Sequence, residues 1–475
     1  MGVSSGAGTA APARQRIGGR PSGNLPILLT MCAGYFLVLL DVTIVNIALP
    51  SLGRDLHATV DELQWVVDGY AVLLASLTLI CGTLGDRLGH KRIVLSGLAL
   101  FGLASLGCAL APGASWLVGG RVAQGVGAAL LFPGTLAIIN RTYDGAAGQA
   151  RAIGIWAAVG SLALPAGPLL GGALVQWLGW RSIFLLNLPL LAVALPAAAL
   201  LVREEPPARA RRLDPAGAAA GALFLGCLTF AFIQAGRAGT RAPQVGVAAA
   251  AAVALGAAFV LLERRAADPM LPLPLFRRPA FTVANVAAGT MNLGTLGMLF
   301  VVTQYLQDVQ GRAPLAAGLT LLPAFLPLVV LSPLAGRVAG RIGPRVPVAV
   351  GLLVAGAGLG AMVTLEVRTP IAAIVPVFLA WGVGLAVLTP SVVSAAMGAV
   401  SRERSGLASG VNNTARQAGG AIGIAAFGAL AGSVARPQAF LAGMHAGGLV
   451  AGALYGLVGL LSLAVLPGSL RGRAR

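Results

Sequence analysis

The chain has 475 residues, of which 57% are hydrophobic and only 10% are charged, and its mean hydropathy is +0.86. Soluble domains carry about a quarter charged residues, so this composition excludes a water-soluble protein and predicts an all-α integral membrane protein. The net charge of +18 would suit a nucleic-acid-binding protein, but the basic residues cluster in short loops between apolar runs, as in membrane proteins, and we expect no nucleic-acid partner.

The apolar runs predict fourteen transmembrane helices, because each is close to the roughly 20 residues that a span requires. They cover residues 26–48, 63–84, 92–111, 115–138, 152–174, 181–202, 214–235, 243–262, 280–304, 316–336, 346–366, 371–393, 406–431 and 441–466. We expect residues 1–25 to form a cytoplasmic tail, because the run after them is too long for the core of a signal peptide.

Lysine and arginine predict the orientation of these spans. An even number of spans puts both termini on one side, and the tails and loops of that side hold 24 of the 33 basic residues. The opposite loops hold seven, including the local exceptions Arg237 and Arg241, and two lie inside spans. The positive-inside rule therefore places both termini in the cytoplasm. A composition rich in Ala, Gly and Arg, with Lys91 as its one lysine, indicates a GC-rich genome and hence a bacterial cytoplasmic (inner) membrane.

The first span contains the stretch LLDVTIVNIALP, which places Asp41 in an apolar run; Asp68, Arg121 and Arg416 are the other charges well inside spans. At about 1.5 Å per residue, Asp41, Asp68 and Arg121 reach a similar depth on three helices, so pairing is possible and would lower the cost of burial. One interpretation is a static salt bridge that fixes helix packing. The other is a proton site, because desolvation favours the neutral acid while a nearby arginine favours the carboxylate.

A proton and a cationic substrate that compete for one acid would give antiport directly. We predict Asp41 as the principal proton carrier and Asp68 as the second candidate, although Asp68 can also be merely interfacial. Arg416, in NNTARQAGG, has no acidic residue at matching depth in its own half of the chain. It can contact the first half, bind an anionic substrate or be solvated in a cavity.

The chain contains an internal repeat with offsets of 254, 256 and 257 residues. The matching segments are GTLGDRLGHKR (82–92) with GRVAGRIGPRV (336–346), QGVGAALLFP (124–133) with WGVGLAVLTP (381–390), and GPLLGGAL (167–174) with GIAAFGAL (423–430). Repeated halves are typical of transporters. We predict a first six-helix half at 26–202, two inserted and lipid-facing helices at 203–265, and a second six-helix half with a short tail at 266–475.

The motifs, in their order, resemble the major facilitator superfamily, and within it the fourteen-spanner drug:proton antiporter family of the EmrB and QacA type. LDVTIVNIALP closes the first span, GTLGDRLGHKR joins the second and third, RVAQGVGAALLFP opens the fourth, GSLALPAGPLLGG lies in the fifth and WRSIFLLNLP opens the sixth. The resemblance implies two pseudo-symmetric halves and alternating access. It also implies export of hydrophobic or cationic drugs or antibiotics by a monomer that needs only a proton gradient and no cofactor.

The resemblance further implies roles for three groups of residues. Arg121, in RVAQG, would take part in proton coupling. The loop that locks the halves in one transport state would be formed by Gly82, Gly85, Asp86, Arg87, Gly89, Lys91 and Arg92. The antiporter motif of the fifth span would be Gly154, Gly167, Pro168, Gly171 and Gly172, with Ala163 where the family pattern has glycine.

The substrate cavity is expected between the halves near the midplane. Candidate lining residues are Asn46, Gln124, Trp156, Asn285, Met291, Asn292, Met298, Gln304, Trp381, Asn412, Arg416 and Gln417. Apolar walls with few polar groups suit an amphipathic small molecule. Most of these side chains can equally be ordinary contacts between helices.

Three other functions compete with drug export. A dedicated exporter of one endogenous product, such as an antibiotic, amino acid, lipid or siderophore, would share the fold. A non-transporting sensor or scaffold would not need the embedded charges. An enzyme is disfavoured, because no Ser/His/Asp grouping and no Cys/His cluster with metal spacing occurs. ATP-driven transport is also disfavoured, because no phosphate-binding loop of the G-x-x-x-x-G-K-[ST] type is present. We therefore expect a transporter without metal or cofactor.

Overall fold

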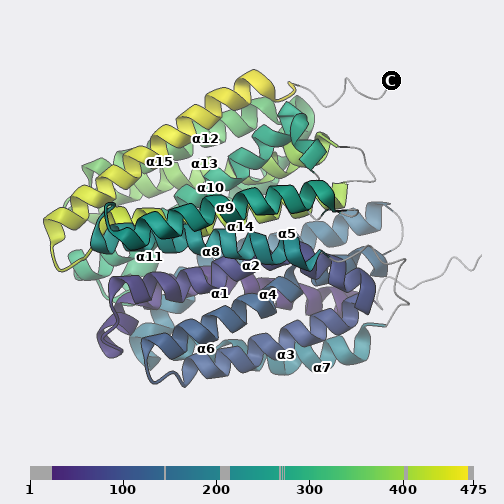
Figure 1. The fold of residues 1–475 in the computed structure, drawn as a ribbon, viewed down its shortest axis with the longest axis horizontal. Helices are drawn as coiled ribbons and strands as arrows, with labels where there is room; N and C mark the ends of the chain where they lie inside the picture. The colour runs from purple at the N-terminus through teal and green to yellow at the C-terminus, as the bar shows by residue number, and fades with distance from the viewer. Residues whose placement is uncertain are drawn as a thin grey trace, which may run out of the picture.

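The computed structural model describes residues 24–143, 146–203, 214–266, 269, 271, 273–400 and 405–468. The predicted all-α class is confirmed, because the described residues form helices and no strand. The helices run roughly parallel or antiparallel to one another in one bundle, and the start of the first helix and the end of the last lie at the same end of it (Figure 1).

The elements follow the chain in two groups with a pair between them. The first group is α1 (Leu25–Asp55), α2 (Val60–Leu88), α3 (His90–Ala109), α4 (Ala114–Thr142), α5 (Ala146–Leu178), and α6 (Ser182–Leu185) with α7 (Asn187–Leu201). The pair is α8 (Pro215–Ala238) and α9 (Pro243–Arg265). The second group is η2 (Leu273–Arg277), α10 (Pro279–Gln304) with the π-helical turn η3 (Tyr305–Val309), α11 (Pro314–Ile342), α12 (Arg345–Gly360) with η4 (Ala361–Thr364), α13 (Ile371–Gly398), α14 (Ser405–Ala431) and α15 (Pro437–Val465).

Local sequence signals explain where these helices begin and end. Thr59 and Glu62 form a capping box at the start of α2, in which each satisfies a backbone N–H of the first turn. α2 ends at Gly89 and α11 ends at Gly343, with φ angles of +94° and +85°. Only glycine adopts such angles at little cost, so the glycine shared by the two repeated loops makes an equivalent tight turn in each half.

Twelve helices of the described chain are long and apolar enough to cross a membrane, or up to thirteen if the two parts of α2, bent by 54°, form one span. The predicted fourteen is thus not reached by this criterion. α14 has 27 residues but is not among the twelve, and it carries Asn412, Arg416 and Gln417 in its interior. The protein is a multi-pass membrane protein.

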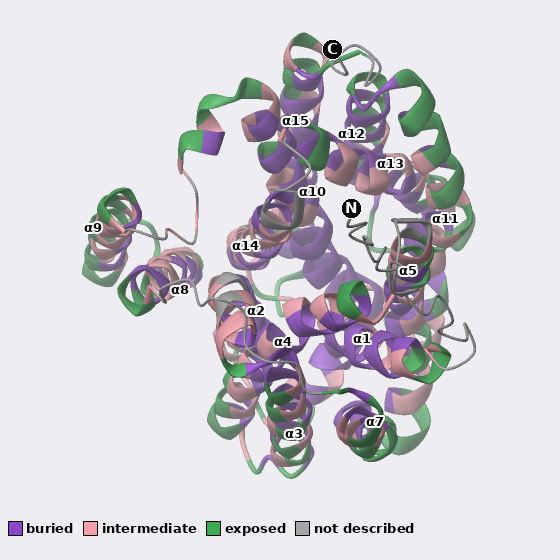
Figure 2. Cartoon of the chain, turned by 90° about the vertical axis from the view of Figure 1, so that its right-hand side faces the viewer, coloured by how far each residue is buried: buried purple, intermediate pink, exposed green. Residues whose placement is uncertain are grey.

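The two groups of helices face each other along two seams, α5 against α11 and α2 against α14. At the first seam the backbones touch: Gly172 of α5 lies against Pro314, and Gly318 of α11 lies against the carbonyl of Pro168. Small residues allow this approach. The pair α8 and α9 packs on the outside of the α2–α14 seam, and α9 is mostly exposed (Figure 2).

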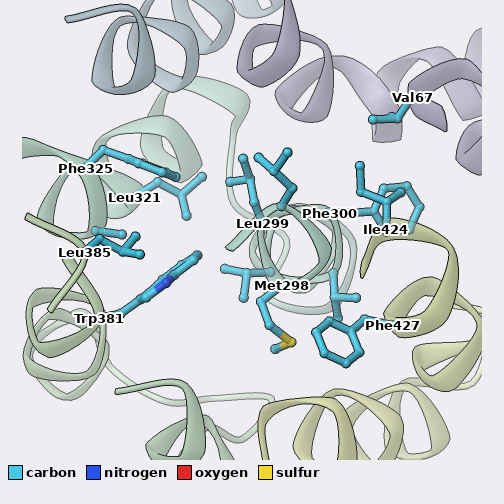
Figure 3. Packing of buried hydrophobic residues seen from close by; sticks show 14 of the residues in the cluster. Val67, Met298, Leu299, Phe300, Leu321, Phe325, Trp381, Leu385, Ile424 and Phe427 are labelled. Atoms are coloured by element: carbon cyan, nitrogen blue, oxygen red, sulfur yellow. The ribbon is translucent and has the colours of Figure 1, made fainter. Parts of the chain in front are cut away.

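Buried apolar side chains fix the second half around α10. Met298 and Leu299 of α10 lie between Trp381 and Phe325 on one side and Phe427 on the other (Figure 3). All five are buried. Lipid is as apolar as these side chains, so the stabilisation comes from close packing rather than from transfer out of water. This cluster holds α10 in the position from which it faces the first half.

Candidate functional site

A buried ion pair joins α1 to α4. The Nη1 atom of Arg121 contacts the Oδ2 atom of Asp41, and both side chains have 0% exposure. The structure therefore brings together two of the three charges that the sequence placed at one depth in the first half. Pairing lowers the cost of burying each charge, which an isolated carboxylate or guanidinium would carry in full.

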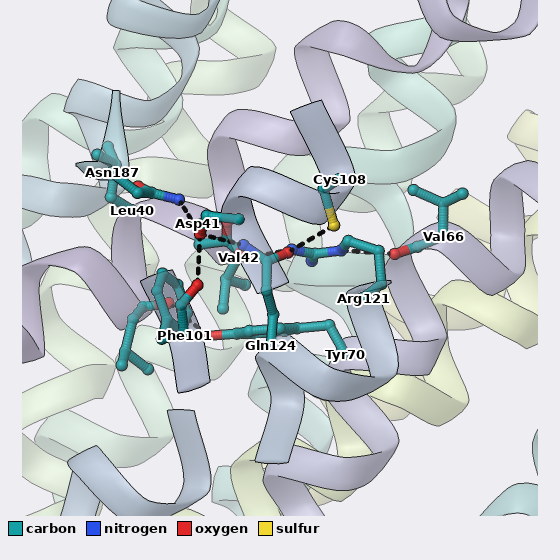
Figure 4. Close-up of polar contacts among 12 residues, drawn as sticks. Leu40, Asp41, Val42, Val66, Tyr70, Phe101, Cys108, Arg121, Gln124 and Asn187 are labelled. Atoms are coloured by element: carbon teal, nitrogen blue, oxygen red, sulfur yellow. Dashed lines mark hydrogen bonds and ion pairs between the residues drawn. The ribbon is translucent and has the colours of Figure 1, made fainter. Parts of the chain in front are cut away.

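The remaining contacts of Arg121 come from its own helix and from α2 (Figure 4). Its Nε atom donates to the carbonyl of Val66 at 2.8 Å, and Nη1 also donates to Oε1 of Gln124 at 2.9 Å. The guanidinium carbon lies 4.4 Å from the centre of the Tyr70 ring, a favourable cation–π distance. The Tyr70 hydroxyl in turn donates to the carbonyl of Val38 on α1 at 2.9 Å.

Gln124 extends this network to two further helices. Its Nε2 atom donates to Oγ of Ser105 on α3 at 2.8 Å, and the Cys108 thiol donates to its Oε1 atom at 3.5 Å. Asn187 of α7 also donates to Ser105, at 3.2 Å. Sequence reasoning did not assign roles to Ser105, Cys108 or Asn187; the one signal was the asparagine in the WRSIFLLNLP motif. The network thus links α1, α2, α3, α4 and α7.

Two atoms of the ion pair are left without partners. The Oδ1 atom of Asp41 and the Nη2 atom of Arg121 are buried and have no hydrogen-bond partner within the described ranges. Unpaired buried polar atoms are costly, so the contacts of this pair satisfy the hydrogen-bonding capacity of Asp41 and Arg121 only in part.

Asp68 lies elsewhere, at the seam between the halves. One turn before it, Gln64 packs against Gly428 of α14, and one turn after it, Val72 clusters with side chains of α8 and α14. Residues four apart share a face of a helix, so Asp68 faces this seam. It is completely buried, and neither carboxylate oxygen has a hydrogen-bond partner in the described structure. The structure does not bring Asp68 to the Asp41–Arg121 pair.

The predicted gating loop lies at the junction of α2 and α3. Oδ1 of Asp86 lies 3.1 Å from Nε2 of His90 and 3.4 Å from Nη2 of Arg141, both in the first half. Gly85 lies directly against the His90 ring, which leaves no room for a side chain there. The other predicted loop residues occupy the last turns of α2, the turn and the first turn of α3: Gly82, Arg87, Gly89, Lys91 and Arg92.

The predicted antiporter motif lines two faces of α5. A Cβ atom at Gly167 or Gly171 would collide with α1, and one at Gly172 would collide with α11. The carbonyl of Pro168 touches α11 as well, whereas a Cβ at Gly154 would meet nothing within 4 Å. Four of the five motif residues therefore hold α5 between the two halves, in contact with the helix that carries Asp41.

A cavity lies between the halves. It is lined by Leu39, Val42, Leu164, Met291, Asn292, Thr295, Leu296, Phe325, Leu328, Leu385, Thr389, Arg416 and Gln417. Leu39 and Val42 share one face of α1, since they are three residues apart, and Asp41 points away from that face towards α4. The ion pair is thus next to the cavity but not in its wall.

Of the predicted lining residues, Met291, Asn292, Arg416 and Gln417 line this cavity. Two others bond to each other: Nδ2 of Asn412 donates to Oδ1 of Asn285 at 3.3 Å.

The remaining candidates make contacts that are typical of helix packing. Trp156 stacks on Tyr35 at 3.7 Å between ring centres, and Trp381 packs at 5.9 Å from Phe325. Asn46 and Gln304 donate to carbonyls one turn earlier on their own helices, at 2.9 and 3.2 Å. Gln124 belongs to the Arg121 network and Met298 to the buried cluster around α10.

Two helical halves around a central cavity, with a buried acid–arginine pair beside it, form the architecture of a membrane transporter. The chain belongs to the Major Facilitator Superfamily, whose model matches residues 31–424. A peptide transporter POT with bound sulfate has a similar structure over 93% of this chain and 96% of its own, with a TM-score of 0.66 and 17% identity, which shows the fold alone.

Among curated relatives, the multidrug resistance protein Stp of Mycobacterium tuberculosis (strain CDC 1551 / Oshkosh) is 39% identical over 85% of this chain and 75% of the relative. The methylenomycin A resistance protein of Streptomyces coelicolor is 35% identical over 89% of each chain. The tetracenomycin C resistance and export protein of Streptomyces glaucescens is 36% identical over 87% of this chain and 76% of the relative.

Proposed function

We propose that the protein is a proton-coupled antiporter that exports hydrophobic drugs or antibiotics across the bacterial cytoplasmic membrane by alternating access. Relatives named for multidrug resistance and for antibiotic resistance and export support the drug-efflux part. The observation that carries the coupling part is the buried Asp41–Arg121 pair, whose helix α1 also forms part of the cavity wall.

The geometry suggests how one proton could change the cavity. With Asp41 charged, Arg121 ties α1 to α4. Protonation of Asp41 would remove the charge attraction, while Val66 and Gln124 would still hold the guanidinium at 2.8 and 2.9 Å. α1 would then be free to shift relative to α4. Because Leu39 and Val42 line the cavity from the same helix, such a shift would alter the substrate site directly.

Contacts between the halves gather at the end of the bundle opposite the termini. Arg54 and Asp308 form an ion pair at 3.0 Å, and Gln307 donates to the carbonyl of Ile47 at 2.9 Å. The backbone N–H of Leu315 donates to Gln176 at 3.3 Å. If the termini are cytoplasmic, as the positive-inside rule predicts, this is the closed outer end of an inward-facing state.

We further propose fourteen spans and membership of the fourteen-spanner drug:proton antiporter family. Both described chain ends lie at one end of the bundle (Figure 1), which requires an even number of crossings. Adding the bent α2 and the polar α14 to the twelve apolar helices gives that number. We also propose that the protein acts as a monomer in the inner membrane, with both termini cytoplasmic, and that it uses the proton gradient without a cofactor.

A dedicated exporter of one compound is the second candidate. It is supported by relatives named for single antibiotics, methylenomycin A and tetracenomycin C. A panel of structurally unrelated compounds separates the two candidates. Transport of several of them indicates a multidrug exporter, and transport of one indicates a dedicated exporter.

The proposed function is tested in inside-out vesicles with an imposed pH gradient, acid inside. Uptake of at least one compound of the panel should follow the gradient and stop when a protonophore collapses it. Vesicles without the protein are the control. Uptake that is unchanged by the protonophore would refute proton coupling, and no uptake of any compound would refute drug export.

A further inference from the structure

Arg416 is a cation in the wall of the cavity for which the protein provides no counter-charge. It projects from α14 and is one of the thirteen lining residues. Its Nε atom is buried and has no hydrogen-bond partner in the described part of the chain. Within the described residues, its guanidinium also forms no ion pair.

Arg121, in contrast, has partners for its charge and for the N–H groups of Nε and Nη1. Arg121 has a carboxylate, an amide oxygen, a backbone carbonyl and an aromatic face. For Arg416 the nearby ionisable group is Tyr35 of α1, a phenol whose ring stacks on Trp156. A phenol does not supply the negative charge that a guanidinium in a largely apolar site requires.

The other lining residues do not supply it either. None of the thirteen is acidic, and the polar ones, such as Asn292, Thr295 and Gln417, are neutral. The Thr389 hydroxyl is already bonded to the carbonyl of Leu385 at 2.8 Å. The acid closest along α1, Asp41, points to α4 and is taken by Arg121. The net charge of the thirteen lining side chains is therefore positive.

We propose that Arg416 binds an anionic group of the exported compound, so that the preferred substrates are amphipathic organic anions, carboxylates in particular. This rests on the proposed function and names its substrate class. A planar guanidinium presents paired N–H donors that match a carboxylate, and the leucine, methionine and phenylalanine walls suit an apolar body. The proposal differs from the cationic substrate expected from the sequence, which would compete with a proton for Asp41, because Asp41 is not among the residues that line the cavity.

Three probes with one apolar body test the proposal: 1-pyrenebutyrate, its methyl ester and 1-pyrenebutylamine, which are anionic, neutral and cationic. Binding to the purified full-length protein is measured by fluorescence. The wild type should bind the acid at least about tenfold more tightly than the ester, as expected for a charge-assisted pair of hydrogen bonds. Arg416→Gln should remove this preference while leaving ester binding unchanged.

Two further variants keep the result interpretable. Arg416→Lys retains the positive charge but lacks the paired N–H donors of a guanidinium, so it should keep part of the preference for the acid over the ester. Arg368→Gln, an exposed arginine after η4, is the matched control and should behave as wild type. Equal binding of acid and ester by the wild type, tighter binding of the amine, or an unchanged preference in Arg416→Gln would overturn the proposal.

Transport of the same probes separates this inference from the proposed function. In one outcome, vesicles accumulate the ester in a gradient-dependent way while Arg416→Gln leaves the preference for the acid unchanged. That result would support the proposed antiport and refute the anion site at Arg416. If no probe is accumulated but the acid binds through Arg416, the anion site stands and the transport proposal must be revised.

Discussion

Arg121 and Arg416 are both arginines in the interior of helices, but their surroundings give them different properties. Arg121 is enclosed by Asp41, Gln124, Val66 and Tyr70, so it is a fixed part of the first half. Arg416 faces a cavity. The sequence located the embedded charges and the shared depth of Asp41 and Arg121. It could not show which side of a helix each occupies, because that depends on how neighbouring helices rotate and pack.

The Asp41–Arg121 pair predicts an unequal response to mutation. Arg121→Gln leaves a buried carboxylate without its cation and should cost about 3–5 kcal/mol of stability. The double variant Asp41→Asn/Arg121→Gln removes both charges and should be more stable than Arg121→Gln alone. Thermal unfolding of the purified proteins in detergent measures this. A double variant no more stable than Arg121→Gln would show that the two charges do not compensate each other.

We expect substitution of Asp68 to have the opposite effect, a gain in the stability of the folded protein. Its carboxylate is buried without a hydrogen-bond partner in the structure described. Asp68→Asn removes the charge of this carboxylate, whose burial without a partner is costly, and should therefore stabilise the protein by about 1–3 kcal/mol. Glu366→Gln, at an exposed position, is the control and should be neutral. Lower stability in Asp68→Asn would mean that the carboxylate has a stabilising partner, and loss of coupling at normal stability would assign it a proton role.

Among the elements, the apolar runs predicted the helices well and their ends poorly. The fifth span was predicted at 152–174, whereas α5 extends over Ala146–Leu178, because a helix continues beyond the apolar core into its polar flanks. The sixth span, predicted at 181–202, is confirmed as one span over Ser182–Leu201, since Leu186 between α6 and α7 keeps helical backbone angles. α14 was predicted as a span from the run at 406–431, although it is not among the described helices that are apolar enough to cross a membrane.

The close approach of α5 and α11 depends on the absence of side chains. Gly172→Val should force the backbones apart, since a Cβ there would lie 2.7 Å from the carbonyl oxygen of Pro314. We expect a fall of several degrees in the unfolding temperature, consistent with a cost of about 1–3 kcal/mol for overpacking. Gly246→Val in α9, where a Cβ meets nothing within 4 Å, is the matched control. An unchanged Gly172→Val protein would show that this contact is not needed.

The internal repeat predicted two halves and an inserted pair of helices, but it did not predict which helices of the two halves contact each other. The residues that line the cavity come from six helices of both halves, and no local sequence pattern predicts that combination. Asn292 and Gln417 line the cavity while Asn285 and Asn412 bond to each other, although all four are polar residues in spans. Their difference arises only from the packing of α10 against α14.

The Arg54–Asp308 contact predicts that transport requires separation of the halves at this end. Arg54→Cys/Asp308→Cys, joined by a short cleavable thiol cross-linker, should lose transport and regain it when the linker is cleaved. The ion pair bridges α1 and η3 at 3.0 Å, so the linker would hold the halves closed. The uncrosslinked double variant is the control. Full transport in the crosslinked protein would place the moving contact elsewhere.

The coupling role of Asp41 is the centre of the proposed mechanism, and a transport assay of the wild type and Asp41→Asn tests it directly. In inside-out vesicles with an imposed pH gradient, the wild type should accumulate a transported compound against its concentration gradient. Asp41→Asn should lose this accumulation but retain exchange of the compound between the two sides without a gradient. Accumulation by Asp41→Asn at the wild-type level would contradict the account, because the ion pair with Arg121 would then serve only to hold α1 against α4.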